Sequence, residues 1–404
     1  MPADQRMREI ADMSMGFNTT AVHGGKQDES GYAAVNYPIF LSSTFCQPDT
    51  ETEGEFCYSR GGNPTRAAVE KLAADVEGAS FCLATASGMA ATSMVFELLH
   101  CGDKLLLNNN VYGGTWRFVS NLFEQRGIQY EIVDDFNTYD FSRADADVKM
   151  VFLETPSNPL LAVTDIRRVV QQVSGKDILV VVDNTFMTAY LQRPLDLGAD
   201  IVVYSATKYY AGHSDILAGL VITNHEDLYE RLKFISNTLG GILSPLDAFL
   251  LSRGIRTLGV RMDRHQENAW KLASWLEQED GVEKIYFPAL ADHPGHELHK
   301  SQASGFGAVI SFLLKETYDM EKFVASLKLF SFAVSLGGVE SLICRPSTMT
   351  HESYTPELQR KIGIHSNLLR ISVGLEDAKD LIDDLEQAFR AAEPHTVNAG
   401  LRKN

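Results

Sequence analysis

Short apolar runs recur along the middle of the chain and predict a layered α/β domain. From about Ala67 to Asn224 they alternate with longer stretches of helical periodicity, such as Thr115–Arg126 and Asp165–Val173. Several runs have no polar residue at alternate positions, which is typical of strands covered on both faces of a sheet. The alternation favours a mainly parallel, doubly wound sheet, in which ligands bind beyond the carboxyl ends of the strands. The expected strands are Phe81–Thr85, Lys104–Leu107, Tyr130–Val133, Met150–Glu154, Ile178–Asp183, Ile201–Tyr204 and Leu220–Thr223.

The two ends of the chain have different patterns. Residues 1–61 are rich in Gly, Ser, Thr, Asp and Glu with little periodicity, and predict an extended amino-terminal arm. After Leu246 a long helical pattern continues to Trp275, and it links a large domain, residues 62–258, to a smaller carboxyl-terminal α/β domain, residues 259–404. The elements expected in the small domain are strands Lys284–Phe287, Ala308–Leu313 and Leu369–Val373, and a closing helix from Glu376.

Composition and charge exclude several classes of protein. Of 404 residues, 45% are hydrophobic, and 36 basic against 53 acidic residues give a net charge of −17. Such a chain repels nucleic-acid phosphates and anionic lipid surfaces. No apolar run approaches the ~20 residues of a membrane helix, and the polar amino terminus does not resemble a signal peptide. The five cysteines form no CxxC pair, as expected of small buried residues in a reducing compartment. We therefore predict a cytoplasmic protein with neither nucleic-acid nor membrane partners.

Three groups at expected strand ends suggest a cofactor. Lys208 follows Ser205 and Thr207 at the end of one strand, and two hydroxyls beside a cation suit an anion or phosphate. Asp183 ends an all-apolar strand, and the small-residue turn Ala84–Ala91 leads into a helix whose free N–H groups would face an anion. Taken singly, these are also the features of a solvated lysine, a helix cap and a common α/β turn. Together they meet the needs of pyridoxal 5′-phosphate, whose aldehyde binds a lysine and whose ring nitrogen pairs with a carboxylate.

Other polar residues carry weaker signals. His293, His296 and His299 have spacings compatible with a metal, but they lie in a loop containing Pro and Gly with no nearby cysteine. We therefore predict no metal site. Glu154, at another strand end, is interpreted as a structural residue or as one that contacts the residues of the site without touching the ligand.

Six segments of the chain carry a family resemblance, and they are Tyr58–Thr65, Ser87–Ala91, Tyr112–Thr115, Glu154–Pro159, Ser205–Tyr209 and Leu369–Asp377. In sequence and in order they resemble the Cys/Met-metabolism family of pyridoxal-phosphate enzymes, which contains the cystathionine lyases and synthases and methionine γ-lyase. The similarity runs from about Thr19 to Phe389, nearly the whole chain. It implies fold type I of the pyridoxal-phosphate-dependent transferases and a homotetramer built from two catalytic dimers.

The resemblance also implies roles at the cofactor. Lys208 would hold it as a Schiff base and later carry protons, while Asp183 would pair with the ring nitrogen. Tyr112 would stack on the ring, and Tyr112 or Tyr58 would assist proton transfer. The phosphate would be bound by the backbone of Gly88 and Met89, the hydroxyls of Ser205 and Thr207, and Tyr58 and Arg60 of a neighbouring subunit.

For the substrate, the resemblance implies that Arg370 clamps the α-carboxylate of an amino acid, where a planar guanidinium suits bidentate pairing. Asn158 would lie near the ring hydroxyl or that carboxylate, and Val334 and Ser335 belong to a substrate-contacting segment. Cystathionine γ-lyases and γ-synthases often carry glutamate at the position of Val334, and methionine γ-lyases usually carry cysteine at that of Gly114.

The chemistry implied is carbon–sulfur lysis of a sulfur amino acid, giving an oxo acid, ammonia and a thiol. Cystathionine with β or mixed β/γ cleavage is the first hypothesis. Methionine γ-lyase-like activity and a cystathionine γ-synthase or sulfhydrylase type of transfer are alternatives within the family. An aminotransferase and a non-catalytic protein that binds the cofactor are alternatives from other classes.

Overall fold

A computed structural model describes residues 15–25, 34–52 and 54–394 of the chain. Its larger sheet has seven strands in the order β1-β7-β6-β5-β4-β2-β3. Apolar side chains cover both faces of the central strands, so Val180 to Val182 and all of β6 are buried. The strands are β1 (Phe81–Thr85), β2 (Lys104–Asn108), β3 (Gln129–Val133), β4 (Val148–Glu154), β5 (Leu179–Asp183), β6 (Ile201–Tyr204) and β7 (Gly219–Thr223).

The sheet is mainly parallel, as the sequence predicts. Strands β3, β2, β4, β5 and β6 run in one direction, and only β7 is antiparallel to its neighbours β6 and β1. All seven expected strands are confirmed within two residues at each end. The carboxyl ends of β4, β5 and β6 therefore meet at one edge of the sheet, with Glu154 beside Asp183 in the register.

Helices cover both faces of the larger sheet, and polar residues at their starts explain where several begin. Asn63 accepts hydrogen bonds from the backbone of Thr65 and Arg66, and Pro64 occupies the first turn of α3. Asp165 caps α6 in the same manner. These helices are α3 (Pro64–Glu77), α4 (Gly88–Phe96), α5 (Gly113–Leu122), α6 (Ile166–Val173), α7 (Thr188–Leu191) and α8 (Glu226–Leu239), with 3₁₀ turns Glu124–Arg126, Phe141–Arg143 and Pro194–Leu197.

The smaller sheet has five strands in the order β10-β11-β12-β9-β8. Its three longer strands were expected from the sequence, but two short strands, β10 and β11, were not, because two or three residues carry no periodicity. The strands are β8 (Val282–Tyr286), β9 (Val309–Leu314), β10 (Ser331–Phe332), β11 (Leu342–Cys344) and β12 (Leu368–Ser372). They pack with α11 (His296–Gln302), α12 (Met320–Ser326), α13 (Pro356–Lys361), α14 (Ala378–Ala392) and the 3₁₀ turn Pro346–Thr348.

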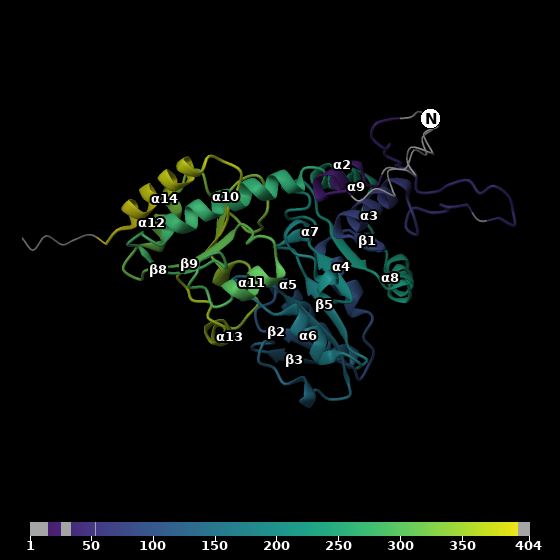
Figure 1. Cartoon of the computed structure of the whole chain (residues 1–404), viewed down its shortest axis with the longest axis horizontal. Helices are drawn as coiled ribbons and strands as arrows, with labels where there is room; N and C mark the ends of the chain where they lie inside the picture. Colours follow the sequence, from purple (N-terminus) through teal and green to yellow (C-terminus); the bar gives the residue numbers. More distant parts are fainter. Residues whose placement is uncertain (1–14, 26–33, 53, 395–404) are drawn as a thin grey trace, which may run out of the picture.

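The long helical pattern after Leu246 is two helices, α9 (Pro245–Ile255) and α10 (Leu258–Leu276), which corrects the expectation of one. The buried guanidinium of Arg261 explains the break, since its Nη2 donates to the carbonyl of Gly254 at 2.7 Å. A side chain at Gly254 would overlap the carbonyls of Tyr210 and Ala211, so this turn packs directly on the large domain. Helix α10 then crosses from the larger sheet to the smaller one, with α12 and α14 at the far end (Figure 1).

The amino-terminal region also differs from the expectation of an extended arm. Phe17–His23 forms a helix, α2, whose Phe17 ring packs edge-on against Tyr190 at 4.9 Å between centroids. The rest of the described arm has an isolated bridge between Thr44 and Tyr58. Residues 1–14 and 26–33 of the predicted arm lie outside the described residues. The domain boundaries at 61 and 258 stay a prediction.

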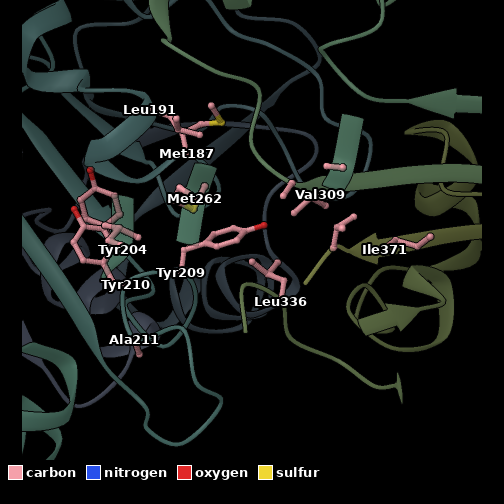
Figure 2. Close-up of a cluster of buried hydrophobic side chains, with 14 of the residues drawn as sticks. Met187, Leu191, Tyr204, Tyr209, Tyr210, Ala211, Met262, Val309, Leu336 and Ile371 are labelled. Carbon is pink, nitrogen blue, oxygen red and sulfur yellow. The ribbon is translucent and has the colours of Figure 1, made fainter. Parts of the chain in front are cut away.

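One apolar core joins the two sheets. It includes Tyr209 from the large domain, Met262 from α10, and Val309 and Ile371 from the smaller sheet. Figure 2 shows Tyr204 and Tyr210 together on one side, with ring centroids 4.8 Å apart, whereas Tyr209 points toward Leu336. The residue after Lys208 is thus fixed by packing between both sheets. Among the described helices, none is long and apolar enough to cross a membrane.

Candidate active site

A cavity of about 720 Å³ lies at the carboxyl ends of β4, β5 and β6, between the larger sheet and segments of the smaller domain. Eleven of the thirteen residues predicted for the site line it, although they come from positions spread over nearly three hundred residues. Those eleven are Gly88, Met89, Tyr112, Asn158, Asp183, Ser205, Thr207, Lys208, Val334, Ser335 and Arg370.

The amino end of α4 forms one wall of this cavity. Ser87 caps the helix by accepting from the N–H of Ala90, and the first N–H groups of a helix have no acceptor within it. A Cβ added at Gly88 would lie 2.7 Å from Cβ of Ser205, so only glycine lets this turn approach the end of β6. N–H groups without an acceptor and the positive end of the helix dipole suit this wall to an anion.

Lys208 and Asp183 are a charged pair of the cavity, and each is partly shielded from solvent. Burial, together with the charge of Arg370, lowers the pKa of Lys208 to about 8 against the opposing effect of Asp183. Burial raises the pKa of Asp183, while the hydrogen bond from Thr185 and the charge of Lys208 favour its ionised form. With this pKa, about a tenth of the Lys208 amine is unprotonated and nucleophilic at pH 7, far more than for an ordinary lysine.

Glu154 supports the turn that carries Tyr112. Its Oε1 accepts from the backbone N–H of Tyr112 at 2.6 Å. Burial and the neighbouring charge of Asp183 raise the pKa of Glu154 well above its ordinary range, against the hydrogen bond from Tyr112. The Tyr112 side chain is 44% exposed and lines the cavity, which leaves its ring free to contact a ligand.

Arg370 brings the smaller sheet to the site. From β12, its Nη1 donates to Oδ1 of Asn158 at 2.8 Å, and its Nη2 donates to the carbonyl of Ser335 at 2.8 Å. Arg370 is 2% exposed, and its Nε has no hydrogen-bond partner among the described residues. A buried guanidinium with spare donors and no carboxylate of its own suits the carboxylate of a ligand.

Ser205 and Thr207, whose hydroxyls are predicted to bind phosphate, also make hydrogen bonds within the fold. Thr207 Oγ1 already donates to the carbonyl of Ala218 at 3.2 Å and accepts from its N–H at 2.9 Å. The backbone N–H of Ser205 donates to Oγ1 of Thr185 at 2.9 Å. The Thr207 hydroxyl therefore also fixes the turn that presents Lys208.

Tyr58 and Arg60 are the two predicted residues that do not line the cavity. Arg60 Nη1 donates to the carbonyl of Asn237 on α8 at 2.5 Å, and its guanidinium lies 5.7 Å from the ring centre of Tyr58. The Tyr58 side chain is half exposed. Within one chain these residues contribute nothing to the cavity.

Sequence reasoning missed the segment 349–353 and Arg117, which also line the cavity. Tyr354 OH donates to the carbonyl of Val111 at 3.0 Å, and Ser353 Oγ donates to that of Gly113 at 3.2 Å, so this segment covers the Tyr112 turn. The signal available was Gly113, where any side chain would overlap the carbonyl of Thr350. A glycine after a strand end marks a close approach, but it does not name the partner.

The residues present fit a phosphate-bearing aldehyde with a basic ring. The α4 turn suits the phosphate, the Lys208 amine the aldehyde, and the buried Asp183 carboxylate the protonated ring nitrogen. The fold and this site define a pyridoxal-phosphate-dependent enzyme of fold type I.

Comparison with known proteins agrees with this class. Residues 18–390 match the family model described as "Cys/Met metabolism PLP-dependent enzyme". Cystathionine beta-lyase of Lactococcus lactis subsp. cremoris is 46% identical over 92% of this chain and 98% of its own length. Cystathionine gamma-lyase of Bacillus subtilis is 44% identical over the same shares. The crystal structure of cystathionine gamma synthase from Xanthomonas oryzae pv. oryzae with cystathionine has a TM-score of 0.91 and 41% identity, covering 94% of this chain and 99% of that one. The chain belongs to the Cys/Met-metabolism family of pyridoxal-phosphate-dependent enzymes.

Proposed function

We propose that the protein is a carbon–sulfur lyase that cleaves cystathionine by β- or mixed β/γ-elimination. The observation that carries this proposal is the cavity in which the Lys208 amine faces both Asp183 and the Arg370–Asn158 pair. This arrangement can hold an amino acid by its carboxylate beside a base. The relatives named cystathionine beta-lyase and gamma-lyase, at 46% and 44% identity, support the substrate.

Each step of the chemistry has a residue in this cavity. Pyridoxal 5′-phosphate, when bound, supplies an electron sink for the charge left at the substrate Cα. Asp183, whose ionised form the hydrogen bond from Thr185 and the charge of Lys208 favour against burial, would pair with a protonated ring nitrogen. The Lys208 amine removes the proton from Cα, and Arg370 with Asn158 holds the α-carboxylate so that this proton points at the amine.

The leaving group is the thiol of the half of cystathionine whose carboxylate is not held by Arg370. Tyr112 protonates the departing sulfur, a role supported by its exposure at the cavity wall. Loss of homocysteine from Cβ follows removal of the Cα proton and leads to pyruvate and ammonia. Loss of cysteine from Cγ requires a second proton to be removed, at Cβ, and leads to 2-oxobutanoate and ammonia. Either sequence consumes one water molecule.

Val334 supports β or mixed cleavage over strict γ-cleavage. It lies at the cavity wall, is 53% exposed and offers an apolar surface where γ-directed relatives often carry a carboxylate. The distal ammonium of cystathionine therefore lacks a charged partner at this position. Replacement of a γ-substituent, as in a γ-synthase, is the second candidate, supported by the TM-score of 0.91 to such an enzyme.

We infer that the active unit is a homotetramer of two catalytic dimers and that Tyr58 and Arg60 serve the neighbouring site. Both residues lie outside their own cavity, and the described arm around them exposes Ile39, Leu41 and Val35 at 37%, 75% and 87%. Apolar side chains at such exposure suit a subunit interface.

A product assay tests the proposal. The purified protein with pyridoxal phosphate is incubated separately with cystathionine, methionine, cysteine and homocysteine, and pyruvate and 2-oxobutanoate are measured apart. Cystathionine should give the highest kcat/KM, with pyruvate as a substantial product. Turnover of methionine above that of cystathionine would contradict the proposal, and amino transfer to an oxo acid without thiol release would indicate an aminotransferase.

A further inference from the structure

A row of buried polar side chains runs behind the active-site cavity, and we call it the amide chain. Its members belong to five different segments and are each at most 8% exposed: Gln302, Gln192, Asn184, Tyr204 and Glu77. Of these, none lines the cavity. Burying this many polar groups is costly unless their hydrogen bonds are made.

The hydrogen bonds between side chains of the amide chain all run one way, and Asn184 Nδ2 also donates to the backbone carbonyl of Gln192 at 2.7 Å. Gln302 Nε2 donates to Gln192 Oε1 at 3.3 Å, and Gln192 Nε2 donates to Asn184 Oδ1 at 2.9 Å. Asn184 Nδ2 donates to Tyr204 OH at 2.9 Å, and Tyr204 OH donates to Oε2 of Glu77 at 2.6 Å. Bonds aligned in this way polarise one another, so each member fixes the orientation of the next.

Gln192 is the junction of this chain. Besides Asn184, its Nε2 donates to the carbonyl of Thr155 at 3.0 Å. Thr155 begins the turn that leads to Asn158, and Asn184 directly follows Asp183. One amide group therefore holds the turn after β4 to the turn after β5.

These two turns carry opposite halves of the active site. Asn158 is bonded to Arg370, the carboxylate-binding residue, whereas Asp183 faces Lys208. The spacing between these halves decides whether the substrate Cα proton points at the lysine. A displacement of 1 Å in such a spacing can cost about a hundredfold in rate.

Gln302 connects this junction to the smaller domain. It ends α11, and its Nε2 also donates to the carbonyl of Thr164 at 3.0 Å, while its Oε1 accepts from the N–H of Ile166 at 3.3 Å. Because both N–H groups and the oxygen of the Gln302 amide are hydrogen-bonded, this amide has one orientation. That orientation presents Nε2 to Gln192 and so selects how the Gln192 amide is turned.

We propose that Gln192 is a positioning residue that sets the spacing between the Arg370–Asn158 pair and the Asp183–Lys208 pair, and that Gln302 orients it from the smaller domain. The inference rests on the cofactor and carboxylate roles of the proposed function, and it is independent of which sulfur amino acid is cleaved.

The test uses three single variants of the holoenzyme and one double variant. Gln192→Met and Gln302→Met keep the side-chain volume and remove the amide. Gln387→Met is the matched control. Gln387 on α14 donates to the carbonyls of Ser326 and Asp384, and it belongs neither to the lining of the active-site cavity nor to the amide chain. For each, the measurements are thermal stability, kcat, and the pH midpoint of the absorbance change of the bound cofactor without substrate.

All three single variants should lose thermal stability, but only Gln192→Met and Gln302→Met should alter the active site. Gln192→Met should shift the absorbance midpoint by about half a pH unit or more and lower kcat about tenfold or more. Gln302→Met should shift both in the same direction. The double variant, Gln192→Met with Gln302→Met, should shift the absorbance midpoint no further than Gln192→Met alone, because Gln302 acts through Gln192.

A purely structural role gives a different pattern. If Gln192→Met and Gln302→Met lose stability as Gln387→Met does and keep the wild-type midpoint, the proposal is overturned. Additive shifts in the double variant would overturn the part assigned to Gln302. If Gln192→Met does not fold, Gln302→Met alone decides, because it leaves both turns bonded to Gln192. Absence of a cofactor signal in the unaltered protein would instead refute the proposed function itself.

Discussion

Arg370 Nη1 and Asn158 Oδ1 lie 2.8 Å apart and join the smaller sheet to the larger one inside the active-site cavity. Arg370 is on β12 and Asn158 follows β4, so this pair, which we propose binds the substrate carboxylate, is formed by docking of the two sheets. The same arginine lowers the pKa of Lys208, after the larger effect of burial. The proposed substrate binding and the basicity of Lys208 are thus linked through one side chain.

This link predicts a pH effect that depends on charge at position 370. In the apoprotein, Lys208 has a pKa of about 8, so its unprotonated amine increases as pH rises through that value. The rate of covalent cofactor attachment should follow the same curve. Arg370→Met removes a positive charge and should move the midpoint upward, whereas Arg370→Lys keeps the charge and should leave it nearly in place. Stopped-flow absorbance between about pH 6.5 and 10 measures both. Equal midpoints in the two variants would contradict the electrostatic link.

Gly88→Ala should weaken cofactor binding without unfolding the protein. The added Cβ would lie 2.7 Å from Cβ of Ser205, so the α4 turn must move away from β6 and its N–H groups must leave the phosphate site. We expect cofactor affinity to fall about tenfold or more, measured by titration of the apoprotein. Gly241→Ala is the control, because its Cβ would meet Ala90 Cβ at an ordinary 3.6 Å. Equal affinity in both variants would show that the turn does not bind the phosphate.

Mixing two inactive variants tests whether the arm serves a neighbouring site. Arg60 lies outside its own cavity and Lys208 inside it. Arg60→Ala chains mixed with Lys208→Ala chains should regain activity, because a hybrid dimer contains one unaltered site. The control is each variant taken alone through the same mixing procedure. No recovery, with subunit exchange confirmed by mass spectrometry, would mean that each site is complete within one chain.

Val334→Glu should shift the enzyme toward cystathionine and toward γ-cleavage. A carboxylate there can pair with the distal ammonium, and a charge-assisted contact contributes about 1.5–3 kcal/mol, roughly ten- to a hundredfold in discrimination. The kcat/KM ratio for cystathionine over methionine and the ratio of 2-oxobutanoate to pyruvate should both rise. Val334→Gln, similar in size without the charge, is the control. If both ratios stay within about twofold of wild type at unchanged cofactor content, Val334 is not the selector.

Local patterns predicted the larger sheet and, in the cavity, Asp183, Lys208 with its neighbouring hydroxyls, and the α4 turn; the family resemblance supplied the other cavity residues. Asp183 was readable because an apolar run that stops at a charged residue marks the edge of a buried sheet, and Lys208 because it closely follows the next such run. The break between α9 and α10 was not readable, because it depends on Arg261 reaching a carbonyl seven residues away. The segment 349–353 and the amide chain were missed for the same reason: Gln192 and Gln302 lie 110 residues apart, and no local pattern pairs them.

The central claim is that Lys208 binds pyridoxal phosphate covalently and acts as the base. Borohydride reduction of the holoenzyme, followed by peptide mapping, tests it most directly. The account predicts the reduced cofactor on the peptide containing Lys208, and none attached in a folded Lys208→Ala variant, whose lyase activity should also be very low. Label on another lysine of the unaltered enzyme, or undiminished activity of Lys208→Ala, would contradict the account.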